Sequence, residues 1–210
     1  CVMSIVTYNN RSIANISAVP GAAKSLTHIK TLTASSSGTL DFLNGSDDVV
    51  FDSTYPIYLF KFIDIHPATD DVVFTFQADT GTNTNYNQAV TSTNFATQHG
   101  ESDSPTELSY VDNRDQAQGT AFQPLSGHND LGNDNDQCLS GQLHIFNPAS
   151  TTFVKHFIAT TNQAGYSDRS VNSFIAGYFN TTTALTRVQF KMDSGNIDAG
   201  TIKLYGLKDS

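Results

Sequence analysis

The chain reads Arg187-Val188-Gln189-Phe190-Lys191-Met192 and, after the linker 193–200, Thr201-Ile202-Lys203-Leu204-Tyr205-Gly206-Leu207. Apolar residues occupy alternate positions in both stretches, and polar residues occupy most of the positions between them. A period of two indicates β-strands that each have one buried face and one solvated face. The linker is rich in Gly, Asn and Asp, which favour turns. We therefore predict a β-hairpin with a long loop, and we expect its last strand to lie inside a sheet.

Similar apolar runs separated by turn residues recur upstream of this stretch. Strands are expected at 26–34, 39–43, 55–65 and 72–78, and again from 139 onward. The run 55–65 is the most apolar, which indicates a central strand buried for part of its length on both faces. Residues 79–137 are poor in large apolar side chains, so only two or three weaker strands joined by long loops are expected there.

The composition favours an all-β chain with a neutral surface. Only 15% of the 210 residues are charged, whereas Ser, Thr, Asn and Gly are abundant and disfavour helices. We predict an antiparallel β-sandwich of the jelly-roll type with about ten strands. The net charge of −9 argues against a nucleic-acid partner, and the lack of a long apolar run argues against a membrane partner.

The domain organisation is predicted to be an extended N-terminal arm, 1–25, followed by a single β-sandwich domain, 26–210. Cys1 and Cys138 are the two cysteines, and we expect both to be free thiols because a terminal cysteine rarely anchors a disulfide framework.

The loop 129–136 is the most oxygen-rich segment of the chain. Its carboxylates Asp130, Asp134 and Asp136 are the type of ligand that Ca²⁺ prefers. Their spacing does not match an EF-hand loop, so the alternative is a solvated acidic turn. The sequence requires no cofactor, and Ca²⁺ is the one candidate.

No nucleophile elbow, phosphate loop or zinc-ligand pattern is present in the sequence, which favours a protein that is not an enzyme. Glu101 and Glu107 are the only glutamates and could form a glycosidase-type carboxylate pair. His144 and His156 lie on neighbouring expected strands and could meet across a sheet. The alternative for both pairs is an ordinary structural or surface role.

A carbohydrate-binding surface would need aromatic rings on which sugars can stack. The chain has no Trp, so Tyr86, Tyr110 or Tyr166 would have to serve. The alternative is that these tyrosines are structural.

Four blocks of the sequence resemble a C-terminal-signature family of virion structural proteins of tailed, especially marine, bacteriophages. The blocks are Phe190–Gly206, Tyr55–Ile63, Gly132–Gln137 and Phe146–His156. The resemblance implies a β-rich, non-enzymatic protein located in the virion, and it transfers no set of functional residues.

The function expected from this resemblance is that of a capsid decoration or cement protein that stabilises the head through subunit contacts. The alternatives are a tail fibre or adaptor protein and a receptor- or glycan-binding module. The expected partners are copies of the chain, arranged as a trimer, and the major capsid protein or other virion subunits. The scarcity of Lys and Glu fits such contacts, because interfaces are depleted in both. The arm 1–25 and the stretch 79–137 are the expected contact surfaces.

Overall fold

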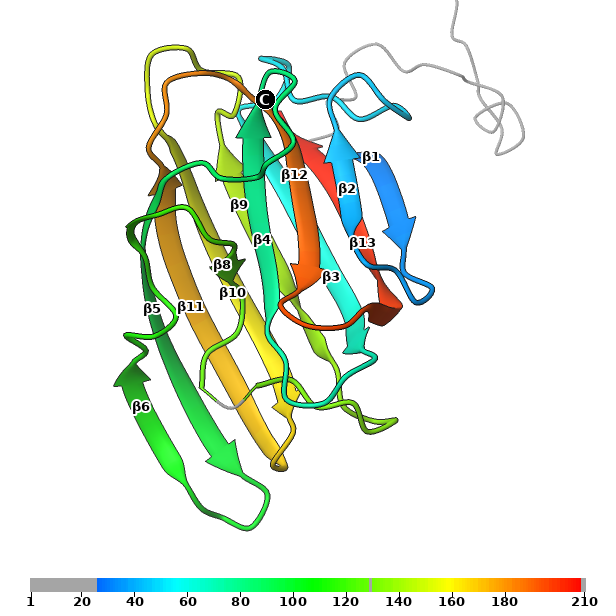
Figure 1. Ribbon diagram of the computed structural model, residues 1–210, viewed down its shortest axis with the longest axis vertical. Coiled ribbons are helices and arrows are strands. Elements are labelled where there is room, and N and C mark those ends of the chain that lie inside the picture. Colours follow the sequence, from blue (N-terminus) through cyan, green and yellow to red (C-terminus); the bar gives the residue numbers. More distant parts are fainter. Residues whose placement is uncertain (1–25, 129, 209–210) are drawn as a thin grey trace, which may run out of the picture.

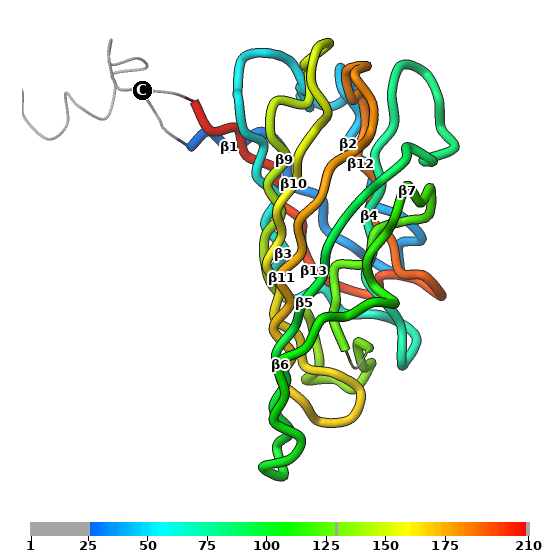
Figure 2. The backbone as a smooth tube through the Cα atoms, turned by 90° about the vertical axis from the view of Figure 1, so that its left-hand side faces the viewer, coloured from blue at the N-terminus to red at the C-terminus, as the bar shows by residue number. Residues whose placement is uncertain are grey.

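The computed structural model describes residues 26–128 and 130–208, so the predicted arm 1–25 lies outside the described residues. The described chain is all-β and forms two antiparallel sheets that pack face to face, as Figures 1 and 2 show. The predictions of an all-β chain and of antiparallel sheets are confirmed. The expected count of about ten strands is too low, because thirteen are present in this part of the chain. Among these residues, no helix has the length and apolarity needed to cross a membrane.

The large sheet has nine strands. Its order is β1-β13-β3-β9-β10-β11-β5-β6, and β7 pairs with β5 off this path. The strand bounds are β1 Leu26–Thr33, β3 Ile57–Pro67, β5 Val90–Gly100, β6 Thr106–Tyr110, β7 Ala117–Gly119, β9 Leu139–Phe146, β10 Lys155–Gly165, β11 Arg169–Phe179 and β13 Ile197–Leu207.

The small sheet has four strands in the order β2-β12-β4-β8. The strand bounds are β2 Leu40–Leu43, β4 Phe74–Thr80, β8 Gln123–Pro124 and β12 Leu185–Met192. Four ladders pair early strands with late ones: β1 with β13, β2 with β12, β3 with β9 and β4 with β8. The early strands β1–β4 and their late partners therefore form one antiparallel ribbon that passes through both sheets.

The predicted hairpin of the last two strands is wrong. Strand β12 pairs with β2 and β4 in the small sheet, whereas β13 pairs with β1 and β3 in the large sheet. The linker 193–196 carries the chain from one sheet to the other. Strands β3 and β4, which are also consecutive in the sequence, likewise lie in different sheets.

The predicted burial of these strands is confirmed. Val188, Phe190 and Met192 of β12 are at most 2% exposed. Strand β3 buries three successive residues, Tyr58, Leu59 and Phe60, because it lies between β13 and β9 inside the sheet.

The two sheets are joined by a cluster of phenylalanines centred on Phe190 of β12. Its ring centroid lies 5.2 Å from that of Phe60 and 5.4 Å from that of Phe62, both on β3 of the opposite sheet. Within its own sheet the ring stacks on Phe74 and Phe76 of β4. Offset and edge-on contacts of this kind stabilise a core beyond the area they bury.

Replacing Phe190 by Ala is therefore expected to destabilise the fold by about 3–5 kcal/mol, because the cavity lies where both sheets meet. The matched control is Phe153→Ala, which removes a ring that is 69% exposed and should change stability by less than about 0.5 kcal/mol. Urea denaturation followed by circular dichroism measures both. Equal effects of the two substitutions would contradict the central role of Phe190.

Candidate interaction surface

Strands β10, β11, β5 and β6 extend the large sheet, and in Figure 1 β6 lies beyond the cover of the small sheet. The inner face of this extension is mixed: Phe157, Ile175 and Phe179 belong to the main core, whereas polar side chains bond to residues 123–126 of β8 and the segment after it. Ser92 on β5 donates a hydrogen bond to Gln123 Oε1 (2.6 Å), and Asn94 donates one to the Ser126 carbonyl (3.2 Å). Thr161 on β10 donates another to the Leu125 carbonyl (2.6 Å). These bonds satisfy polar groups that would be costly to bury unpaired.

The opposite face of the same four strands has no second layer of described chain over it, as the left-hand side of Figure 2 shows. We call the outward-facing side chains of β5, β6, β10 and β11 the open face. Strand alternation and burial assign to it Thr91, Thr93, Phe95, Thr97, His99, Thr106, Leu108, Tyr110, His156, Ile158, Thr160, Asn162, Ala164, Ser170, Asn172, Phe174, Ala176 and Tyr178.

A row of rings crosses the centre of the open face. Phe95 pairs with Phe174 of β11 on one side and with Tyr110 of β6 on the other. The rings of Phe95 and Phe174 are stacked, with centroids 5.0 Å apart and an angle of 12°. Their side chains are 44% and 36% exposed, and Tyr110 is 53% exposed. A contiguous group of exposed apolar side chains marks a binding surface more often than isolated ones do.

The open face carries no Asp, Glu, Lys or Arg, although the whole chain has a net charge of −9. The charged side chains that contact it are carboxylates at its border: Asp103 lies 3.2 Å from Nε2 of His99, and Asp115 accepts a hydrogen bond from the Tyr110 hydroxyl. Farther along the same side of the sheet, Lys61 and Lys203 pair on β3 and β13. Between them and the open face lies His144 on β9. Burial, followed by the charge of Lys61, lowers the pKa of His144, so its ring is neutral at neutral pH.

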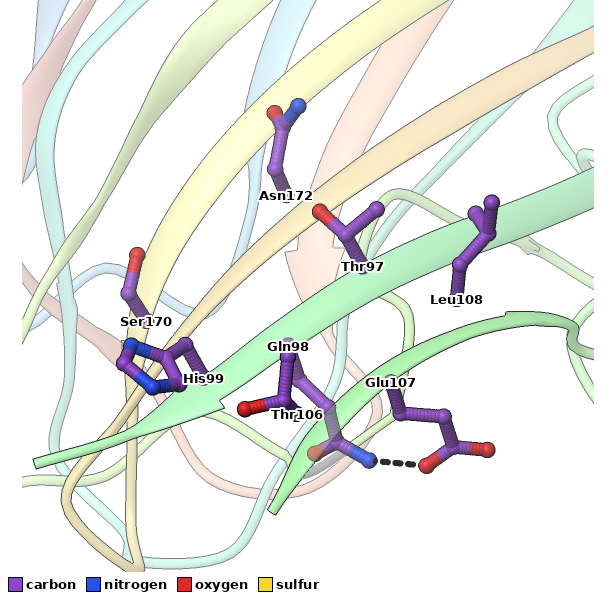
Figure 3. Close-up of a pocket in the computed structure, with 8 residues that line it drawn as sticks. All are labelled: Thr97, Gln98, His99, Thr106, Glu107, Leu108, Ser170 and Asn172. Carbon is purple, nitrogen blue, oxygen red and sulfur yellow. Dashed lines mark hydrogen bonds between the residues drawn. The ribbon is translucent and has the colours of Figure 1, made fainter. Parts of the chain in front are cut away.

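Two shallow hollows of about 420 Å³ each indent the open face. One is lined by Thr97, His99, Leu108 and Asn172 together with neighbouring residues, and Figure 3 shows these side chains above the strands. At its rim, Gln98 donates a hydrogen bond to Glu107 (2.6 Å). The other hollow is lined by residues that include Thr91, Thr93, His156, Ile158, Ala176 and Tyr178.

The acidic loop lies away from the open face. Asp130 pairs with the guanidinium of Arg114, and burial raises the pKa of this carboxyl although Arg114 opposes the rise.

The other two aspartates of the loop lie near His66. Asp134 contacts His66 through its backbone carbonyl, which lies 3.2 Å from Nε2. Asp136 lines a separate hollow of about 440 Å³ that Asp64, His66 and Asp198 also border. In residues 26–128 and 130–208, no cluster of three or more His, Cys, Asp or Glu side chains is placed to hold a metal ion.

The two glutamates both belong to the β5–β6 hairpin: Glu101 lies in its turn and Glu107 on β6. Hydrogen bonds from Gln98 and Ser109 lower the pKa of Glu107. This shift is opposite to the one that a general acid of a glycosidase needs.

The predicted tyrosines and histidines lie in different settings. Tyr110 is on the open face, whereas the hydroxyl of Tyr86 donates to Asp41 (2.8 Å). Tyr166 is exposed in the β10–β11 turn beside the acidic loop. The strands of His144 and His156 pair as expected, but each ring packs on its own aromatic neighbour, Phe146 and Tyr178 respectively.

Sequence reasoning missed Phe95, Phe174, Thr97 and Asn172 as members of one surface. On β5 the inward positions include Ser92, Asn94 and Gln98, so no hydrophobic period marks its buried face, and on β11 apolar side chains occupy both faces. The one available signal was the alternation of Leu108 and Tyr110 with polar residues on β6.

The chain was compared with protein-family models, with curated proteins and with solved structures, and none of the three comparisons finds a match.

The calcium hypothesis for Asp130, Asp134 and Asp136 remains a prediction, and melting measurements test it. Because Asp130 is already paired with Arg114, we expect about 1 mM CaCl₂ to leave the melting temperature unchanged. A site with a Kd of about 10 µM would instead add about 2.7 kcal/mol, or several degrees. A calcium-induced rise that disappears in the double variant Asp134→Asn, Asp136→Asn and persists in the control Asp47→Asn would establish the site.

Proposed function

We propose that this chain is a non-enzymatic structural protein of a bacteriophage virion and that it decorates the capsid as a cement protein. The observation that carries the proposal is the ribbon made by the four ladders β1/β13, β2/β12, β3/β9 and β4/β8. Without β5–β7 and β10–β11, the remaining eight strands pair as β1-β13-β3-β9 and β2-β12-β4-β8. A two-stranded ribbon wrapped into two four-stranded sheets supports a jelly-roll type of sandwich, a fold used by many capsid proteins.

A fold alone does not establish a function. Further support comes from the resemblance to phage virion proteins, because its blocks coincide with parts of this sandwich. Tyr55–Ile63 covers most of β3, and Phe190–Gly206 runs from the phenylalanine cluster to the end of β13. Two of the four blocks thus belong to the core strands, whereas Gly132–Gln137 and most of Phe146–His156 lie in loops.

The expected role is mechanical: the protein would stabilise a shell through contacts with its own copies, arranged as a trimer, and with the major capsid protein. The arm 1–25 is the proposed anchor. The stretch 79–137 is the second proposed contact surface, through those of its residues that lie outside the open face.

Cryo-electron microscopy of the intact particle tests this function. We expect density that fits the sandwich over the capsid lattice, at its symmetry axes or between capsomers. Density on the tail alone would assign the protein to a fibre or adaptor. Absence of the chain from purified particles would contradict a virion role.

Deletion of residues 1–25 tests the anchor separately. We expect the truncated protein to remain folded and to be lost from the particle, as measured by quantitative immunoblotting of purified virions. Incorporation at the level of the full-length chain would contradict the assignment of the arm.

A further inference from the structure

The open face has the form of a track that follows β5 and β11. The Phe95–Phe174 pair stands in its middle, and the two hollows lie on either side of that pair along the same strands. From Thr91 to His99 the track runs about 26 Å, at about 3.3 Å per residue. A surface of this length suits an extended, chain-like ligand.

The side chains that border the rings are hydroxyls and amides. Thr97, Thr106 and Asn172 line one hollow, and within the described chain their side chains make no hydrogen bond. Their donors and acceptors are therefore available to a ligand. The apolar surface of Phe95 and Phe174 lies directly beside them, so hydrogen-bonding and apolar contacts alternate along the track.

This alternation determines the chemistry of the ligand. A pyranose ring presents C–H groups on its faces and hydroxyl groups around its edge, and both kinds of surface find partners here. The open face carries no Lys or Arg, and the carboxylates at its border, Asp103, Glu107 and Asp115, repel a sulfate, carboxylate or phosphate group. Anionic glycans, nucleic acids and acidic membranes bind through ion pairs with Lys and Arg.

We propose that the open face binds a neutral polysaccharide chain that lies along β5 and β11 across the Phe95–Phe174 pair. This function goes beyond the proposed virion role and does not depend on it, because binding is a property of the isolated protein.

A second copy of the chain is the competing occupant. A broad subunit contact would be expected to cover a smooth apolar patch. Here Leu108 and Ile158 add apolar surface to the two hollows, but Thr97, Thr106 and Asn172 lie among the apolar side chains without hydrogen bonds of their own, and an apolar subunit contact would bury them unpaired. The arrangement favours the extended sugar chain.

The experiment measures binding of the purified full-length chain to immobilised uncharged polysaccharides: α- and β-glucans, mannan, galactan and xylan. Alginate and heparin serve as charged comparisons. We expect saturable binding to at least one uncharged polysaccharide and the same affinity in low and high salt, because no ion pair contributes. Failure to bind any of the five, or preference for alginate or heparin, would overturn the proposal.

Matched variants locate the site. Phe95→Ser and Phe174→Ser are each expected to weaken binding about tenfold or more, as loss of a central aromatic contact does. The control Phe153→Ser removes a more exposed ring on the β9–β10 loop and should leave binding unchanged.

Thr97→Val preserves the shape of the side chain and removes its hydroxyl, so it should weaken binding. The control Thr182→Val on the β11–β12 loop should leave binding unchanged. Unaltered binding by both Phe95→Ser and Phe174→Ser would overturn the assignment.

Light scattering after size-exclusion chromatography tests the competing occupant. An oligomer that Phe95→Ser converts to monomers, without binding of any uncharged polysaccharide by either protein, would assign the open face to a second copy.

Discussion

The contact between Phe190 on β12 and Phe60 and Phe62 on β3 is the constraint on which the rest of the structure depends. It joins the small sheet to the large one through rings that meet at 60° and 69°, so neither sheet can slide without separating them. With these strands fixed, β13 fills the place beside β3, and β2 and β4 flank β12. The ribbon that pairs early strands with late ones follows from this arrangement. The long-range pairing is costly in chain entropy, and burial of the phenylalanine cluster offsets that cost.

The local pattern of these central strands was sufficient to predict which residues are buried, but it could not predict the partner strands. Alternation along 187–192 places Phe190 inside, and the structure agrees. The same alternation along 201–207 suggested a hairpin, yet the two strands lie in different sheets. Alternation shows which face of a strand is buried, but it does not show which other strands that face packs against. In a ribbon folded over a shared core, strands that are consecutive in the sequence often face each other across that core.

The extension of the large sheet was harder to predict because polar side chains interrupt its apolar packing, most of all on β5. The inward side chains of β5 include Ser92 and Asn94, and their partners Gln123 and Ser126 come from a segment about thirty residues further along the chain. These bonds are specific pairings between distant residues, and no sequence periodicity encodes them. The stretch 79–137 was therefore expected to hold only two or three weaker strands, although β5 runs for 11 residues. The group of rings on the open face could not be predicted either, because Phe95 and Phe174 become neighbours only when β5 and β11 pair.

The fold is therefore held together without the aromatic rings on the open face of the large sheet. Burial of phenylalanines between the sheets stabilises the eight-strand ribbon and extends to Phe157 and Phe179 on β10 and β11, while hydrogen bonds join the inner face of β5 and β10 to residues 123–126. The stacked pair of Phe95 and Phe174 is not needed to hold the sheets together, because it lies on the side away from the core. Exposed apolar rings reduce solubility, and a protein that covers most of its surface with hydroxyls and amides could have placed threonine at both positions. Two rings paired across neighbouring strands, beside hydroxyls that make no hydrogen bond of their own, are therefore better explained by a ligand than by the requirements of folding.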